Sequence, residues 1–239
     1  MVRHVALKLT ILAVIVCFVN PMVATCDAGP ILPTPAGLTL GETFRFAFVT
    51  DGSISAFSGN IATYDTFVNQ QAHGATYAGH TVTWQAIGST SRVNAIDHIG
   101  VHPAIQGIFL VSGTEVSPGD GTSGLWSGSL ISPIDKDING ATAFSFAIYT
   151  GTSPHGVALH PLGGFPSVVF GDSADSNSRW VDLIPFPLPF IPERMYGISQ
   201  VLTVVPEPSG GLLAVIGGLI GPVLVRFRKS RKEQSHRVP

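Results

Sequence analysis

The chain has little cysteine. Of its 239 residues only Cys17 and Cys26 are cysteines, and both lie in the first 28 positions. The remainder therefore contains no internal disulfide. A domain of roughly 180 residues does not need one, because folding at that length buries about 70% of the surface of the unfolded chain.

Basic residues are scarce in the middle of the chain. From position 29 to 209 there are thirteen acidic residues and only five basic ones, a net charge of −8, whereas the whole chain carries −2. Most of the other cations lie near the two ends. Nucleic acids are bound through a cationic face, so we expect no nucleic-acid partner.

The sequence also lacks several catalytic and metal motifs: the Gly-x-Ser-x-Gly elbow, the phosphate-binding glycine motifs, His-Glu-x-x-His and cysteine-based metal sites. Gly171-Asp172-Ser173 is followed by Ala174-Asp175, where trypsin-like proteases need two glycines. His98 and His102 are four residues apart, but Gly100 and Pro103 argue against a helix that would place both rings on one face. We therefore expect no histidine metal site there.

The N-terminus is typical of a secretory signal peptide over residues 1–28. Arg3 and Lys8 precede an apolar stretch over 9–19, which is too short to span a membrane, and Pro21 ends it ahead of small residues. Cleavage after Cys26 and cleavage after Ala28 both satisfy the small-residue rule. Lipidation at Cys26 is a third alternative.

The C-terminal region has three consecutive parts. The motif Val205-Pro206-Glu207-Pro208-Ser209 must be extended, because its two prolines fix φ and lack amide donors. Sixteen uncharged residues over 210–225 form a membrane span shorter than the roughly 20 residues of a full crossing. A basic tail over 226–232 follows, which the positive-inside tendency places in the cytoplasm: Arg226, Arg228, Lys229, Arg231 and Lys232. Residues 233–239 form a further tail.

This tripartite pattern resembles the PEP-CTERM sorting signal of Gram-negative bacteria. The resemblance implies recognition by an exosortase, transient anchoring in the inner membrane, and sorting to the cell surface or an extracellular matrix. An ordinary single-pass anchor is the alternative.

Between the two signals we expect a lead-in over 29–40 and one α+β domain over 41–204, with an all-β sandwich as the alternative. Alternating apolar residues predict a first strand over 44–48, and apolar residues at spacings of three and four predict one main helix over 60–71. Many short strands follow, over 81–87, 107–111, 143–149 and 201–205. The segment 150–190 is long, irregular and rich in Gly and Pro, and Trp180 indicates that part of it packs.

The order of several short stretches resembles the bacterial C-type-lectin-like domains. These stretches are Tyr64–Val68, Trp84–Ser89, Ile108–Thr114, Leu125–Leu130, Tyr149–Thr152 and Met195–Ser199. The resemblance implies a helix after the first strand, a long loop region, and a last strand that pairs with the first. The disulfides common in that fold are absent here.

Two loops carry oxygen ligands. Asp135, Asp137 and Asn139 alternate before Gly140, which is how short calcium loops bring hard ligands onto one ion, although a tight turn uses the same residues. Asp172, Asp175 and Asn177 form a second such cluster, with a solvated loop as the alternative. Calcium is therefore the one cofactor that the sequence suggests.

We expect a non-catalytic surface or matrix protein that binds exopolysaccharide or a protein through its long loops. Trp126, Trp180 and Tyr149 are either sugar-stacking platforms or core residues. The alternative is an extracellular hydrolase that uses two facing carboxylates. Its candidates are Glu115, Asp120, Asp135, Asp137, Asp172 and Asp175.

Overall fold

The computed structural model describes residues 29–143, 146–186 and 189–206. The predicted signal peptide, Glu207 to Ser209, the span over 210–225 and the basic tail lie outside the described residues. Among the helices described, none is long and apolar enough to cross a membrane.

The domain is a mixed α+β fold built on one large sheet. The nine strands of that sheet are β1 (Thr43–Val49), β4 (Trp84–Ala86), β5 (Ile105–Leu110), β6 (Glu115–Ser117), β7 (Ile148–Tyr149), β8 (Val168–Gly171), β9 (Ile184–Phe186), β10 (Arg194–Ser199) and β11 (Leu202–Thr203). They lie in the order β6-β5-β1-β10-β7-β8-β9, with β11 beside β1 and β4 beside β10. A small second sheet pairs β2 (Thr76–Tyr77) with β3 (His80–Thr81).

Strand β1 lies inside the sheet and connects both ends of the domain. It pairs in parallel with β5 and antiparallel with β10 and β11. The last strands therefore pair with the first, as the lectin-like resemblance implies. Two further bonds, from the Gly41 amide to the Val204 carbonyl and from the Val204 amide to the Glu42 carbonyl, hold the end of the domain against its beginning.

The sheet is buried on both faces around β1. Phe44, Phe46 and Phe48 point into a core that also holds Tyr64 and Val68 of the main helix. Successive side chains of a strand point to opposite faces, so the alternate residues of β1 enter a second core. This second core includes Ala47, Val49, Ile108, Trp126, Trp180 and Tyr196.

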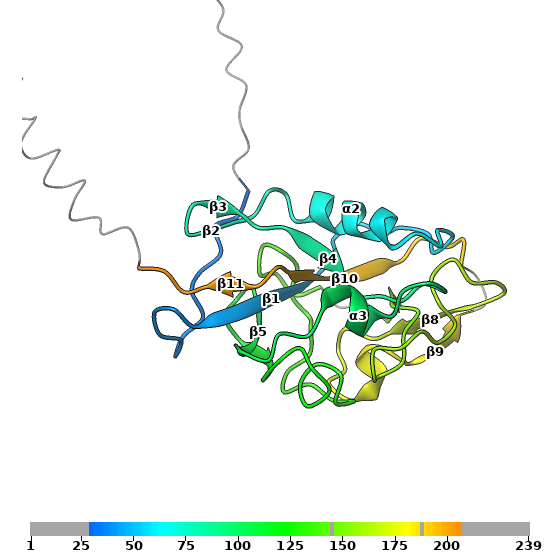
Figure 1. The fold of residues 1–239 in the computed structure, drawn as a ribbon. Coiled ribbons are helices and arrows are strands. Elements are labelled where there is room, and N and C mark those ends of the chain that lie inside the picture. The colour runs from blue at the N-terminus through cyan, green and yellow to red at the C-terminus, as the bar shows by residue number, and fades with distance from the viewer. Residues whose placement is uncertain (1–28, 144–145, 187–188, 207–239) are drawn as a thin grey trace, which may run out of the picture.

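The predicted main helix is α2 (Ile61–Gln71), and it lies along one side of the sheet (Figure 1). Asn60 caps it by accepting a hydrogen bond at 3.1 Å from the Ala62 amide, which satisfies one of the free donors of the first turn. The helix ends at the predicted residue and begins one residue later than predicted, because Asn60 is its cap.

Two expected strands are shorter than their patterns suggest. The stretch 81–87 divides between β3, which pairs in the small sheet, and β4, which pairs with β10, so the chain changes partner at Val82 and Thr83. Among the described residues of the stretch 143–149, the strand β7 comprises Ile148 and Tyr149, which lie between β10 and β8. The ends of a strand are set by where its neighbouring strands offer hydrogen-bonding partners. The alternation of apolar and polar residues along one strand does not show where those partners are.

The short helix α3 (Ala95–Ile99), which was not predicted from the sequence, ends at Gly100 with a φ of 71°. The helix includes His98 but stops before His102, as the glycine leads one to expect.

The segment after β7 is irregular but packed. It contains β8, β9 and a short 3₁₀ helix, Ser178–Trp180, and Trp180 is fully buried as predicted. The backbones of Gly171 and Trp180 approach so closely that a Cβ at Gly171 would lie 1.9 Å from the Trp180 carbonyl oxygen. Only glycine fits at that position.

Candidate functional site

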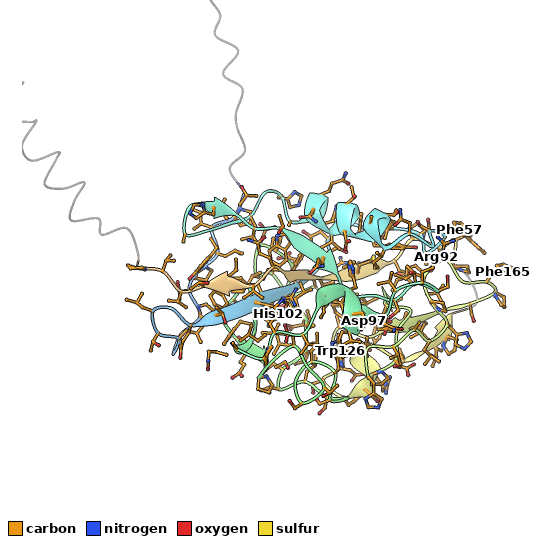
Figure 2. The ribbon with its side chains drawn as sticks, in the orientation of Figure 1. Phe57, Arg92, Asp97, His102, Trp126 and Phe165 are labelled. Carbon is orange, nitrogen blue, oxygen red and sulfur yellow. The ribbon has the colours of Figure 1, made fainter. Side chains whose placement is uncertain are left out.

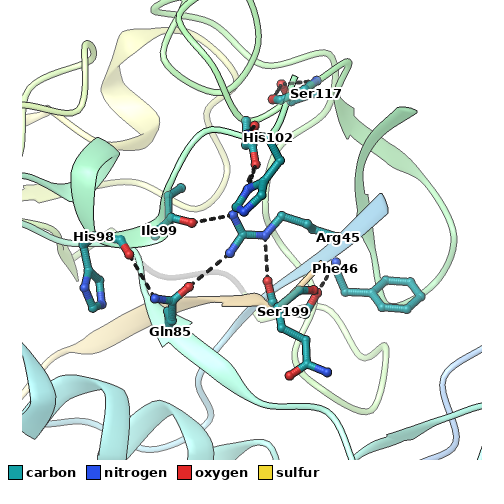
Figure 3. A network of polar contacts seen from close by, with 11 residues as sticks. Arg45, Phe46, Gln85, His98, Ile99, His102, Ser117 and Ser199 are labelled. Carbon is teal, nitrogen blue, oxygen red and sulfur yellow. Dashed lines mark hydrogen bonds and ion pairs between the residues drawn. The ribbon is translucent and has the colours of Figure 1, made fainter. Parts of the chain in front are cut away.

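Arg45 is the centre of a buried polar network that joins four segments of the chain (Figure 3). Its side chain leaves β1 on the face opposite the phenylalanines and is only 1% exposed. Nε donates to the Ser199 carbonyl at 2.7 Å, Nη1 donates to the Ile99 carbonyl at 2.9 Å, and Nη2 donates to Gln85 Oε1 at 3.2 Å. The guanidinium therefore links β1, β4, β10 and the end of α3.

Asp120 supplies the opposite charge. Its Oδ2 lies 3.3 Å from Arg45 Nη1, and its side chain is also 1% exposed. Burial lowers the pKa of Arg45, and the attraction and hydrogen bond of Asp120 oppose that shift. Asp120 therefore offsets part of the cost of burying the guanidinium.

His102 covers Asp120 from the solvent side. The His102 amide donates to Asp120 Oδ1 at 2.8 Å, and the imidazole Nδ1 lies 2.8 Å from Asp120 Oδ2. The ring is 46% exposed. A buried carboxylate therefore fixes the orientation of a half-exposed histidine, an arrangement that suits proton transfer or hydrogen bonding to a ligand.

His98 belongs to a separate contact. Its Nε2 lies 2.9 Å from Asp65 Oδ1 on α2, and its carbonyl accepts from Gln85 Nε2 at 2.9 Å. His98 and His102 therefore contact different carboxylates. Within the described residues, no group of three or more His, Cys, Asp or Glu side chains is placed to hold a metal ion.

The predicted calcium loop forms a turn. Asp137 is buried, and its Oδ1 accepts hydrogen bonds from the Asn139 and Ala141 amides at 2.8 and 2.9 Å. Asp135 pairs with Lys136 at 3.3 Å. Calcium also binds amide and main-chain oxygens, so a calcium site at Asp135, Asp137 and Asn139 stays a prediction.

Asp51 lies beside this loop. Partial burial and the neighbouring Asp137 carboxyl raise the pKa of Asp51, and Arg194 and His73 oppose the shift. The sequence analysis did not connect Asp51 with this loop, because the two positions are far apart along the chain and only the fold brings them together.

The second oxygen cluster also has local partners. Asp172 Oδ1 accepts from the Ala174 amide at 2.9 Å, Asn177 Oδ1 accepts from the Arg179 amide at 2.9 Å, and Asp175 lies 3.1 Å from Arg179 Nε. Asp172 and Asp175 also contribute, after burial, to a raised pKa of Tyr196. These contacts are those of a folded loop.

Five of the six carboxylates of the hydrolase alternative have partners within the domain. Asp120, Asp135 and Asp175 form ion pairs, and Asp137 and Asp172 accept from backbone amides. Glu115 lies on β6. The hydrolase alternative stays a prediction.

Trp126, Trp180 and Tyr149 are not stacking platforms, because all three side chains are fully buried. Trp126 and Trp180 lie with ring centroids 6.1 Å apart, and Trp180 lies 5.6 Å from Tyr196. The core alternative was correct, and any stacking surface must use other aromatics.

The exposed large aromatics of the described residues are phenylalanines, and three of them lie on neighbouring loops. Phe165 is 87% exposed, Phe57 61% and Phe190 54%. Figure 2 shows Phe57, Arg92 and Phe165 together at one end of the domain, opposite the end where the chain continues beyond Pro206. We call Phe57, Arg92, Phe165 and Phe190 the distal loop face.

Backbone hydrogen bonds fix these loops to one another. The Ala56 carbonyl accepts a hydrogen bond from the Gly163 amide at 2.8 Å, and the Ala56 amide donates one to the Pro189 carbonyl at 2.9 Å. The Leu162 amide donates to the Ser89 carbonyl at 2.8 Å, which brings in the loop of Arg92. Gly163 has a φ of 75°, and a Cβ there would lie 2.5 Å from Gly59 Cα. The loops are thus packed together at a position that only glycine can occupy.

Neither the burial of Arg45 nor the exposed phenylalanines were predicted from the sequence. Arg45 alternates with phenylalanines along β1. This pattern indicates that Arg45 lies on the solvent-facing side of the sheet, unless other segments of the chain cover that side. Phe57 and Phe165 stand in Gly-, Ser- and Pro-containing stretches, and large aromatics within such loops were the available signal.

No family model matches the chain, and no curated protein is significantly similar to it.

Proposed function

We propose that this chain is an exported protein, sorted to the cell surface or extracellular matrix, whose C-type-lectin-like domain binds a polysaccharide or protein through the distal loop face. The observation that carries the proposal is the grouping of three exposed phenylalanines on hydrogen-bonded loops. Exposed large aromatics cost solubility and are enriched where proteins bind ligands.

The position of the face supports the same proposal. The motif that begins at Val205 leaves from one end of the domain, and Phe57 and Phe165 lie at the other (Figure 2). If the C-terminal region holds the protein at a membrane, the distal loop face points away from that membrane. This orientation suits contact with a matrix.

The lectin-like part of the proposal is supported by topology. A helix follows the first strand, the last strands pair with the first, and long packed loops separate them. The absence of disulfides departs from the pattern common in that fold.

Binding by the exported protein, which contains the domain over residues 29–204, is measured on a panel of immobilised glycans and matrix extracts. Phe57→Ala with Phe165→Ala should abolish binding and leave the unfolding midpoint unchanged, because both side chains are exposed. Ile131→Ala is the control, since Ile131 lies on another loop and its exposed fraction of 58% is close to the 61% of Phe57. Equal binding by the double variant and wild type would reject the face as the binding site.

Sorting is tested in the producing cell. Pro206→Ala with Pro208→Ala should leave unprocessed protein in the inner membrane, whereas removal of residues 205–239 should release the domain without retention. Normal surface delivery of the double variant would contradict recognition by an exosortase.

A further inference from the structure

A groove lies beside the distal loop face. It has a volume of about 510 Å³ and is lined by Gly59, Asn60, Ile61, Thr90, Ser91, Arg92 and Val93. Its walls are the start of α2 and the turn before α3, and it adjoins the loop of Phe57. A groove of this size accommodates a small ligand or a short stretch of a polymer.

Arg92 is the only cation of the described residues that is exposed and has no ion pair. Arg45 is buried against Asp120, Lys136 pairs with Asp135, and Arg179 pairs with Asp175. The remaining cation, Arg194, is half-buried, and its positive charge opposes the raised pKa of Asp51. One free guanidinium therefore stands in a groove of a domain whose net charge is strongly negative.

The chemistry around Arg92 is that of a sugar site. Asn60 and Ser91 are exposed beside it and offer amide and hydroxyl groups, and Phe57 and Phe165 offer apolar ring faces nearby. A guanidinium holds a carboxylate with two parallel hydrogen bonds, and aromatic faces pack against the C–H faces of sugar rings.

We propose that this groove binds a glycan that carries isolated carboxylates among neutral sugars, with Arg92 holding the carboxylate and Phe57 and Phe165 stacking on neighbouring rings. The proposal rests on the proposed function and names its ligand class. A low density of carboxylates follows from the charges available: the groove offers one guanidinium, which can neutralise one carboxylate, and the net negative charge of the domain disfavours the approach of a polymer with many more. A densely charged polyuronate therefore binds more weakly than a sparsely charged glycan.

The test compares a soluble heteropolysaccharide that has one glucuronate per repeat, the same polymer after reduction of its carboxyl groups to alcohols, polygalacturonate and an acidic peptide. Wild type should bind the sparsely charged polymer about tenfold more tightly than its reduced form, which is the expected size for one charged hydrogen-bonded contact. Arg92→Ala should lose that difference and Arg92→Lys should keep part of it. Arg179→Ala is the control, because Arg179 is exposed but paired with Asp175.

The outcomes separate this inference from the proposed function. Equal binding of the native and reduced polymers, tighter binding of polygalacturonate, or an unchanged Arg92→Ala variant would overturn the assignment of Arg92 while leaving a glycan-binding face. Binding of the acidic peptide alone would replace the glycan with a protein ligand. Binding to none of the four probes would overturn this inference, and only failure on the wider panel as well would count against the proposed function.

Discussion

Arg45 Nη1 lies 3.3 Å from Asp120 Oδ2, and both side chains are 1% exposed. An ion pair so far from water costs desolvation energy, and the pair is retained only where further hydrogen bonds complete it. Here the carbonyls of Ile99 and Ser199 accept further hydrogen bonds from the Arg45 guanidinium, and His102 supplies further hydrogen-bonding contacts to the Asp120 carboxylate. The pair therefore fixes four segments in one arrangement.

Arg45→Met should lower the free energy of unfolding by about 3–5 kcal/mol, because it leaves the Asp120 carboxylate buried without its partner. Urea unfolding measures the loss. Arg179→Met is the matched control and should cost less than about 1 kcal/mol, since Arg179 is exposed and solvent screens its pair with the partly buried Asp175. Equal effects of the two substitutions would show that the buried network contributes no more than a surface pair.

Gly171→Ala should destabilise the domain by about 1–3 kcal/mol or more, because the added Cβ meets the Trp180 carbonyl and the backbone must move. Gly119→Ala is the control, since no atom lies within 4 Å of a Cβ built there. Thermal unfolding of both variants decides the point, and a stable Gly171→Ala protein would mean that the two backbones are less closely packed.

Asp51→Asn should stabilise the domain at neutral pH and have no effect at low pH. The pKa of Asp51 is raised in the folded state, so folding binds its proton more tightly than the unfolded chain does. Stability is therefore lost as the pH rises from the ordinary carboxyl range through the raised pKa, and the substitution removes that loss. The gain should stay below about 1 kcal/mol, because Asp51 is solvent-exposed.

Unfolding midpoints between pH 3 and 8 measure this effect. Asp97→Asn, which removes one exposed carboxylate from α3, is the control for net charge. A gain that is as large at pH 3 as at pH 7 would have a cause other than titration of Asp51.

Millimolar calcium should raise the unfolding midpoint if the loop at Asp135, Asp137 and Asn139 binds the ion, because a ligand of the folded state alone stabilises it by linkage. At a hundred times the dissociation constant the gain is about 2.7 kcal/mol. Asp135→Asn should abolish the rise.

Asp137 is the wrong residue for that test, because its carboxylate also caps the turn and its loss should cost about 1 kcal/mol without any ion. Magnesium at the same concentration is the control for ionic strength. No rise with calcium would leave the loop as a turn, which is the alternative that its composition allows.

The sequence by itself determined the elements whose signals are local. Apolar residues at spacings of three and four gave α2, and alternating phenylalanines gave β1. The patterns at the two ends predict a signal peptide and a sorting signal in the same local way. Each of these follows from spacing over a few residues, so no distant partner is needed to recognise it.

The tertiary structure decided which side chains are buried and which are exposed, because this depends on the segments that cover each face of the sheet. It buried Arg45 beside Asp120, placed the indoles of Trp126 and Trp180 in the core, and left Phe57 and Phe165 exposed on loops joined through Ala56. The physical reason is that the burial of a side chain depends on which segments of the folded chain pack against it. Alternation along a strand says which side chains share a face, and only the packing of distant segments decides whether that face meets water.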